Sequence, residues 1–413
     1  MKALEKVHRE EWGRLLALLF ARFRRLDLVE DALAEAFARA AARWPTDGMP
    51  DNPAAWLYRS AQRTVLDGLR HEDVALRKLP LLAAEVLRPD ATGGHTEVGS
   101  DDSRYADERL PMIFMATHPA LAPEIQAALA LRFVMGLPTS RIARLFLVGE
   151  ATMAARITRG KKKISGSGIP LAIPAAAALP DRLENAARTV YLAFTSAYVP
   201  GEGADLLRTA EAGEAVGLAG MLHALLPHTP LLRCLKALLM LQHARRGARI
   251  SDGALVLLPD QDRSRWHHGE IAEALGLLMD QPPASGYTEE LRLQALIAGA
   301  HCSAPRTEAT DWPSIAGLYG RLEELTVSPV VRLNRAVAVA EADGPAVGLE
   351  LLEGLDARLP GSHRLAGVRA ELLRRCGRTT EAAGHYQLAL DLCKNAAERR
   401  HLQRRVDDLT LPR

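Results

Sequence analysis

The sequence predicts an all-α protein of two or three domains. The chain has 413 residues, 48% of them hydrophobic and 25% charged, which is the balance of a soluble globular protein with buried cores. Ala, Leu and Arg are abundant, aromatic residues make up only 5%, and β-branched residues are sparse. Most of the chain repeats apolar residues at intervals of three and four, which is the period of an amphipathic helix.

The net charge and the cysteine content limit the functions and the cellular compartment that the sequence allows. The net charge of +2 is too small to indicate nucleic-acid binding by the whole chain, so basic patches must be judged locally. The four cysteines are far apart and form no CxxC pair, which favours reduced thiols in a cytoplasmic protein. The first 20 residues lack the pattern of a signal peptide, and no apolar run is long enough for a membrane span.

Residues 1–72 are expected to form the first domain, a bundle of three helices. Asp27 is the expected cap of the second helix, and the Pro-rich segment 45–50 is expected to end it. Asn52 should cap the third helix, with Pro53 in its first turn. The outer side of the second helix is expected to carry three acids: Glu30, Asp31 and Glu35.

The third helix of this bundle has an outer face that mixes one aromatic residue with charges: Trp56, Arg59, Arg63, Asp67 and Arg70. Such a face can contact a sugar-phosphate backbone and stack on an unpaired base. It can equally be a salt-bridged surface with the Trp half buried against a neighbouring helix. The residues alone leave both interpretations open.

Residues 73–104 are expected to be a flexible linker, 105–169 a second helical domain, and 170–180 a second linker. Within 125–164, Gly136 is expected to take a positive φ after an apolar helix. Thr139 or Ser140 should cap a short helix, which ends at a tight turn and leads into a third helix. Two short helices at a steep angle are typical of a helix-turn-helix.

The outer face of the last two helices is basic. From Ser140 to Ile164 a single acid, Glu150, opposes this set: Arg141, Arg144, Arg156, Arg159, Lys161, Lys162 and Lys163. The pattern favours a DNA-binding recognition helix. The alternative is an ordinary helical hairpin with a solvated basic face.

Residues 181–413 read as helices of about 12 to 16 residues separated by short Gly/Pro turns. Pairs of small or apolar residues recur 34 residues apart, the period of tetratricopeptide repeats: Ala336 and Ala370, Val339 and Leu373, Gly348 and Ala382, Leu352 and Tyr386. The second copy fits better, with Gly377 in its inter-helix turn. A partner-binding or self-docking module is expected, and a structural array without a ligand is the alternative.

We find no catalytic constellation and expect no enzyme, no cofactor and no metal. The sequence contains no P-loop, no GxGxxG after a strand and no GxSxG elbow. His243, His267, His268 and Glu270 lack metal-ligand spacing, since adjacent helical histidines point about 100° apart. The charged stretch 259–266 is expected to supply a helix cap and a salt-bridge network between repeats.

With these motifs in hand, residues 11–169 resemble a bacterial sigma factor of the extracytoplasmic-function type, with regions 2 and 4 and a linker in place of region 3. SRIARLFLVGEATMAARITRGKKKI is similar to the region 4.2 pattern S-x-I-A-x-x-L-G-x-S-x-x-T-V-x-x-R-L-x-R-A-R. The positions that match are Ser140, Ile142, Ala143, Thr152, Arg156 and Arg159. The departures are Leu147 for Gly, Gly149 for Ser, Met153 for Val and Gly160 for Ala.

The resemblance implies roles for named residues. DLVEDALAEAFARA resembles region 2.2, which implies core-polymerase contacts, at the β′ clamp helices, for Asp31, Glu35 and Phe37. The β flap would be a further polymerase partner. WPTDGMPDNPAAWLYRSAQRTVLDGLR resembles regions 2.3 and 2.4, which implies binding of the promoter −10 element by Trp56, Arg59, Arg63 and Arg70. Region 4 would bind the −35 element through Arg141, Thr152, Arg156, Arg159, Lys161 and Lys162.

The words DNPAAWL, THPALAPE, RSRW, TDWPSIAGLY and LNRAVAVAEADGP further resemble the sigma-factor subgroup with a C-terminal tetratricopeptide-like extension. Ala116-Thr117 stands where that subgroup usually has Cys-Cys, and AFTSAYV stands for a FNEGY-like word. We therefore expect a promoter-specific initiation factor whose extension regulates it or binds a regulatory protein. The alternatives are a stand-alone helix-turn-helix regulator with a helical-repeat sensor, and an interaction scaffold.

Overall fold

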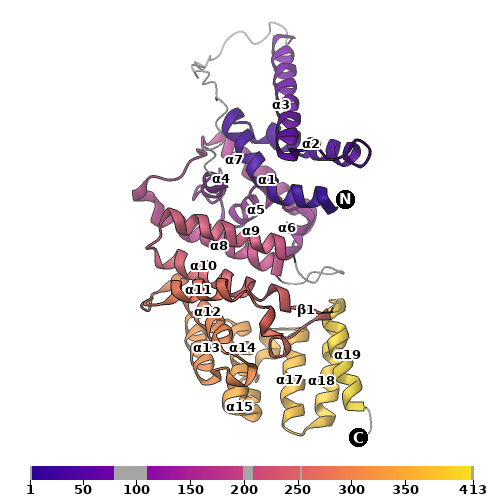
Figure 1. Cartoon of the computed structure of the whole chain (residues 1–413), viewed down its shortest axis with the longest axis vertical. Coiled ribbons are helices and arrows are strands. Elements are labelled where there is room, and N and C mark those ends of the chain that lie inside the picture. Colours follow the sequence, from indigo (N-terminus) through magenta and orange to yellow (C-terminus); the bar gives the residue numbers. More distant parts are fainter. Residues whose placement is uncertain (1, 79–108, 199–207, 252–253, 411–413) are drawn as a thin grey trace. The chain divides into compact units, whose positions relative to one another are not determined.

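The computed structural model describes residues 2–78, 109–198, 208–251 and 254–410. Within them the chain forms nineteen α-helices and one short antiparallel ribbon, β1 (Ile250–Ser251) with β2 (Ala254–Leu255), which confirms the all-α prediction. The chain divides into two compact units, residues 1–189 and 190–413 (Figure 1). Most of the predicted first linker, from residue 79 on, lies outside the described residues. No helix in the described ranges is long and apolar enough to cross a membrane.

The first unit contains an N-terminal bundle (α1–α3) and a helix-turn-helix module (α4–α7). Their bounds are α1 Lys2–Phe23, α2 Leu26–Asp47, α3 Pro53–Lys78, α4 Arg109–Ala116, α5 Pro123–Phe133, α6 Thr139–Leu145 and α7 Glu150–Gly166. Helix α8 (Leu179–Tyr198) runs from the first unit into the second. Leu16, Leu33 and Leu57, one from each bundle helix, are fully buried, so the apolar faces expected from the sequence do meet in one core.

The helix ends of the bundle test the capping predictions. Asn52 does cap α3, because its Oδ1 accepts the backbone N–H of Ala55 at 2.9 Å. The prediction for Asp27 is wrong: α2 begins two residues earlier than expected, at Leu26, and the Asp27 carboxylate instead pairs with Arg25 at 2.9 Å. The helix does end within the expected segment 45–50: α2 continues through Pro45 to Asp47 and ends at Gly48, whose φ is +83°. A proline in the last turn removes only its own N–H bond, which a helix end tolerates.

The turns of the helix-turn-helix module depend on the backbone conformation of single residues. Gly136 has the predicted positive φ, +65°. Neither Thr139 nor Ser140 caps α6; the N-cap position is Pro138, and no side chain bonds there, so that prediction is wrong. Leu147, which stands where the sigma pattern has Gly, adopts φ +52° and is 93% exposed. The left-handed turn therefore forms even with a leucine, at a cost in backbone strain.

Gly160 explains how α7 packs on α5. A Cβ on this glycine would lie 2.7 Å from the side chains of Ile125 and Leu129, closer than real Cβ contacts. Met153, Ile157 and Ile164 are buried on the same side of α7, as the periodicity predicted. The glycine thus lets the recognition helix approach the core of the module, and its opposite face is left outside.

The second unit is a succession of helices. Their bounds are α9 Thr209–Leu225, α10 Pro230–His243, α11 His268–Leu278, α12 Gly286–Ser303, α13 Trp312–Thr326, α14 Pro329–Ala342, α15 Pro345–Glu350, α16 Leu355–Arg358, α17 His363–Arg375, α18 Thr379–Leu392 and α19 Ala396–Thr410. Neighbouring helices pair as hairpins: α13 packs on α14, and α17 packs on α18. This is the packing of a helical-repeat domain.

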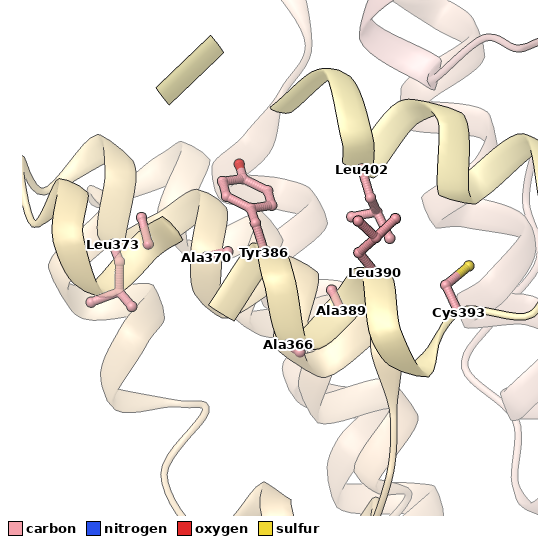
Figure 2. Close-up of a cluster of buried hydrophobic side chains, with 9 residues drawn as sticks. Ala366, Ala370, Leu373, Tyr386, Ala389, Leu390, Cys393 and Leu402 are labelled. Atoms are coloured by element: carbon pink, nitrogen blue, oxygen red, sulfur yellow. The ribbon is translucent and has the colours of Figure 1, made fainter. Parts of the chain in front are cut away.

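The 34-residue period holds in three dimensions. The eight residues that defined it are all buried, in α14, in α17 and α18, and around α15. Gly377 lies in the turn between α17 and α18 with φ +78°, as predicted. Figure 2 shows the core of the second copy, where Ala370 and Leu373 of α17 meet Tyr386 and Leu390 of α18. The first copy is shorter, since α15 ends at Glu350 and the small helix α16 follows.

Candidate nucleic-acid interface

The outward face of α7 is the strongest candidate for DNA contact. Thr152, Arg159 and Lys162 are exposed and Arg156 is partly exposed. The Arg159 side chain folds back on its own helix, with Nε donating to the Ala155 carbonyl at 3.4 Å. Because the apolar side of α7 is packed on α5, these side chains share the free face of a second helix-turn-helix helix. That is the face that enters a major groove in such modules.

Two other residues predicted to touch DNA are occupied within the protein. Arg141 is 7% exposed, at the start of α6. Lys161 turns away from the α7 face and binds a carboxylate oxygen of Glu30 on α2. In this conformation neither side chain is offered to a ligand.

Glu30 was expected on the outer side of α2, and that expectation is wrong, because the residue is only 3% exposed. Its other carboxylate oxygen accepts Nε of Arg132, from α5, at 2.6 Å. The carboxylate thus binds two cations of the helix-turn-helix module, from residues more than 100 positions away in the sequence. A buried carboxylate is stable only when paired in this way.

The helices α1 and α5 also touch. The Trp12 indole N–H donates to the Arg132 carbonyl at 3.3 Å, and the Arg132 guanidinium lies 5.5 Å from the centre of the Trp12 ring. A Cβ on Gly13 would lie 2.3 Å from the Val134 carbonyl oxygen, so only glycine fits there. The N-terminal bundle and the helix-turn-helix module are therefore in direct contact.

Phe37, predicted as a polymerase contact, is buried in this same region. Its ring packs edge-on against His8 with centroids 4.7 Å apart, and His8 stacks on Trp12 at 5.0 Å. Burial, with a smaller contribution from Arg132, lowers the pKa of His8 to about 4. The other two predicted polymerase contacts, Asp31 and Glu35, are exposed on α2, where Glu35 lies 3.7 Å from Arg39.

The aromatic and basic face of α3 divides into two parts. Trp56 is half buried and packs edge-to-face on Trp44 of α2, with ring centroids 5.6 Å apart. That is the packing that the alternative interpretation expected. Arg59, Arg63 and Arg70 are exposed, and Arg70 lies 3.2 Å from Asp67. The arginines thus form a basic strip along α3, with a tryptophan at its base.

The stretch 259–266 supplies the expected cap, and the contacts that it makes with α12 are hydrogen bonds, not the expected salt bridges. Asp262 accepts the backbone N–H of Ser264 at 2.9 Å, and Arg263 donates to the carbonyls of His301 and Ala304 on the α12 side at 2.8 and 2.7 Å. Nearby, Glu270 pairs with Arg246 at 2.7 Å. His243 is buried, which lowers its pKa to about 4. These contacts hold the repeats together.

The packing of the two modules on each other was missed at the sequence level. Glu30 resembles its exposed acidic neighbours, and Arg132 and Lys161 resemble any other basic residues of their helices. The only local signal is glycine at positions 13 and 136, where a backbone or ring approaches closely. A glycine in the sequence does not identify the distant segment that packs against it.

Comparison with known proteins agrees with this division of the chain. Residues 9–74 match the model of sigma-70 region 2, and residues 112–164 match that of sigma-70 region 4. Residues 182–281 match a family of unknown function (DUF6596). Region 2 thus covers most of the N-terminal bundle, and region 4 covers most of the helix-turn-helix module.

One relative spans nearly the whole chain. An uncharacterized protein of Rhizobium meliloti (strain 1021) is 39% identical over 397 residues, which are 95% of this chain and 93% of that protein. The crystal structure of the yeast Tom70 aligns with 99% of this chain and 83% of its own, at 13% identity and a TM-score of 0.32, a likeness too low to bear on the fold.

Two DNA-reading modules with the region 2 and region 4 sequences, in one compact unit, are the working parts of an initiation factor that recognises promoters. The chain therefore belongs to the sigma-70 family, as a sigma factor of the extracytoplasmic-function type with a C-terminal tetratricopeptide-like extension.

Proposed function

We propose that this sigma factor directs core RNA polymerase to promoters by reading two elements with two separate surfaces. The basic face of α7 reads the −35 element, and the basic strip of α3 binds the −10 element. The observation that carries this proposal is that both surfaces present exposed arginines on the two modules that match regions 4 and 2. The protein acts in the cytoplasm, with the polymerase and the chromosome.

Within region 4 the proposed roles differ by side chain. Arg156 and Arg159 are assigned to base edges or adjacent phosphates, because an arginine can bind guanine with two hydrogen bonds. Lys162 and Thr152 are assigned to the DNA backbone. Lys161 joins them only when its ion pair with Glu30 opens, and Arg141 only when the start of α6 rearranges.

Within region 2 the exposed acids of α2, Asp31 and Glu35, are proposed to dock on the β′ clamp helices. Arg59, Arg63 and Arg70 hold the backbone of the opened −10 element, and Trp56 supplies the aromatic surface at the edge of that strip. Phe37 is buried against His8 of α1, so it holds α2 in place from the inner side. It can touch the polymerase only when its contact with α1 opens. The β flap is the proposed partner of region 4 on the polymerase.

The C-terminal domain is proposed to regulate the factor, either by acting on regions 2 and 4 or by binding a regulatory protein. The support is its architecture, because stacked helix hairpins present extended surfaces to protein segments. A truncation is the direct test. It should keep all of α8, since Arg182 of α8 donates to the Phe114 carbonyl in region 4. Transcription and polymerase binding identical to those of the full chain would refute regulation.

Gel-shift assays with promoter DNA, with and without core polymerase, test the main proposal. We expect a specific complex only with the polymerase, because each module alone offers a short basic face. A specific shift without polymerase would instead support the stand-alone regulator. No shift under either condition would support the interaction scaffold.

A pair of substitutions tests the assignment within α7. Arg156→Ala should cost about 1–3 kcal/mol of binding on promoters with one particular base and little on others. Lys162→Ala should weaken all promoters similarly and lower the salt slope by about 1. A uniform loss for both variants would contradict the assignment of Arg156 to a base edge.

A further inference from the structure

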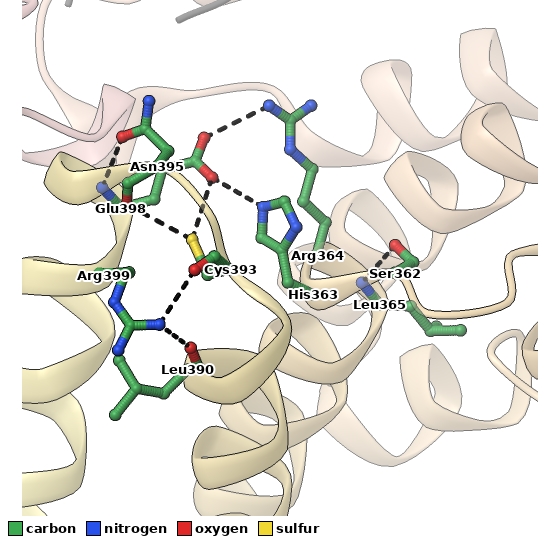
Figure 3. A network of polar contacts seen from close by, with 9 residues as sticks. All are labelled: Ser362, His363, Arg364, Leu365, Leu390, Cys393, Asn395, Glu398 and Arg399. Atoms are coloured by element: carbon green, nitrogen blue, oxygen red, sulfur yellow. Dashed lines mark hydrogen bonds and ion pairs between the residues drawn. The ribbon is translucent and has the colours of Figure 1, made fainter. Parts of the chain in front are cut away.

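Three potential metal ligands converge near the C-terminal end of the second unit. His363 is the first residue of α17, Cys393 directly follows α18, and Glu398 lies in the first turn of α19. Figure 3 shows the three side chains turned toward one another at these helix ends. The imidazole, thiol and carboxylate donor atoms all lie within 4.8 Å of one another.

The distances around Glu398 define the cluster. Its Oε2 is 2.7 Å from His363 Nε2 and 3.8 Å from Cys393 Sγ. The thiol is also 3.6 Å from the backbone carbonyl of Asn395. In a tetrahedral zinc site the metal lies about 2.0 Å from nitrogen and oxygen and about 2.3 Å from sulfur, which puts the donor atoms about 3.3–3.7 Å apart. The two Glu398 distances differ from that spacing by roughly half an ångström, and His363 and Cys393, whose donor atoms lie within 4.8 Å, would have to approach by up to about 1.3 Å.

The cluster is enclosed but not sealed. Cys393 is 2% exposed, while the side chains of His363 and Glu398 are 29% and 20% exposed. Burial raises the pKa of the Cys393 thiol above its usual value. The partly open side gives an ion and a water molecule access to the cluster.

We propose that His363, Cys393 and Glu398 bind one Zn²⁺ ion, with water or the Asn395 carbonyl as the fourth ligand. One nitrogen, one sulfur and one carboxylate oxygen form a borderline-soft set that suits Zn²⁺ and not Mg²⁺ or Ca²⁺. On binding, the Cys393 sulfur loses its proton to solvent and forms the zinc–sulfur bond. The thiolate and the carboxylate together balance the charge of the ion.

Neighbouring groups hold the ligands in place, as the outer shell of a metal site does. The Arg399 guanidinium donates to the backbone carbonyls of Leu390 and Cys393 at 2.6 and 3.0 Å, which fixes the end of α18. Asn395 caps α19 by accepting the Glu398 N–H at 3.1 Å, which fixes the turn that bears the carboxylate. Arg364 lies 3.4 Å from the other oxygen of Glu398, on the side away from the thiol.

The ion would fasten the last helix to the preceding hairpin. Helix α19 otherwise reaches the core of the second repeat copy through Leu402 and the partly buried Val406 and Leu409. A metal bonded to α17, α19 and the residue that ends α18 would couple the order of α19 to the availability of zinc. This inference does not depend on the promoter function.

The alternative is a metal-free contact, in which the His363–Glu398 pair alone ties α17 to α19. Cobalt titration of the chelator-treated full chain distinguishes the two. We expect one Co²⁺ per chain, a thiolate-to-cobalt charge-transfer band, and its displacement by one Zn²⁺ but not by excess Mg²⁺. No saturable band would overturn the proposal.

Matched variants identify the ligands. Cys393→Ser should abolish the charge-transfer band, and His363→Ala and Glu398→Gln should each weaken Zn²⁺ binding at least about 100-fold. Cys376→Ser, at the end of α17, should change neither measurement. Circular dichroism measures the helical content of each variant, and only variants with the helical content of the parent are compared. A band that persists in Cys393→Ser, or affinities unchanged in both His363→Ala and Glu398→Gln, would overturn the assignment.

Discussion

Glu30 lies in the middle of α2, where its buried carboxylate binds Arg132 and Lys161 of the helix-turn-helix module. Removing one member of a buried ion pair leaves uncompensated charges and costs about 3–5 kcal/mol. Both cations are 22% exposed and can partly reach water, so we expect Glu30→Ala to lower the free energy of unfolding by about 3 kcal/mol. Urea denaturation measures it.

Glu35→Ala is the matched control for Glu30→Ala. This neighbour on α2 is exposed and forms only a surface pair with Arg39 at 3.7 Å. Its removal should change the stability by less than about 0.5 kcal/mol. Equal effects of the two substitutions would mean that the buried pairing contributes nothing to the fold.

His8 makes the stability of the first unit depend on pH. Its pKa is about 4 in the folded chain and 6.5 when unfolded, so the folded state keeps the ring neutral. Stability is therefore full well above pH 6.5 and falls as the pH drops through 6.5 toward 4, by about 3 kcal/mol, because the unfolded chain takes up the proton first. His8→Phe should remove that part of the slope in thermal unfolding measured across this range. A slope unchanged in the variant would contradict the assignment.

At the scale of elements, replacing two glycines by alanine, one in each of two equivalent repeat helices, tests how closely those helices pack. A Cβ on Gly348 of α15 would lie 2.7 Å from the Ala336 carbonyl oxygen and 2.6 Å from the Cβ of Ala340, while one on Gly384 of α18 meets nothing within 4 Å. We expect Gly348→Ala to destabilise the second unit by about 1–3 kcal/mol through overpacking. Gly384→Ala should stabilise it by up to about 1 kcal/mol, since alanine favours a helix. Chemical denaturation of both variants tests this, and equal shifts would contradict the close packing of α14 on α15.

The elements were the most predictable part of the structure. Periodicity identified the helices, and a cap such as Asn52 or a turn glycine such as Gly377 fixed several ends. The capping error at Asp27 came from a local rule, because that carboxylate pairs with Arg25 and α2 begins before it. The exposed basic side of α7 was predictable because that helix has one apolar face. The burial of Glu30 and Phe37 was not, since their partners lie on helices that no sequence period relates to them.

At the scale of the whole molecule, the contact between regions 2 and 4 occupies Lys161 and covers Phe37. Under the proposed roles of these residues, the contact would compete with DNA binding by Lys161 and with polymerase binding by Phe37. We therefore expect variants that loosen the contact to bind core polymerase more readily. Gly13→Ala places a Cβ against the Val134 carbonyl oxygen, whereas Gly68→Ala, in α3, makes only an ordinary contact with Leu28. When most molecules keep the contact between regions 2 and 4, a loss of about 1 kcal/mol in the stability of that contact raises the apparent affinity for core polymerase about fivefold. Fluorescence binding of both variants to core polymerase measures this, and equal affinities would contradict the competition.

The account depends most on the identity of the chain as an initiation factor. Run-off transcription with purified core polymerase and genomic promoter fragments tests it most directly. We predict discrete transcripts that require this protein, that are lost together when Arg59 and Arg63 of α3 are both replaced by alanine, and that depend on promoter sequence in the Arg156→Ala variant. No transcript from any fragment, while the protein still binds core polymerase, would contradict promoter recognition as its function.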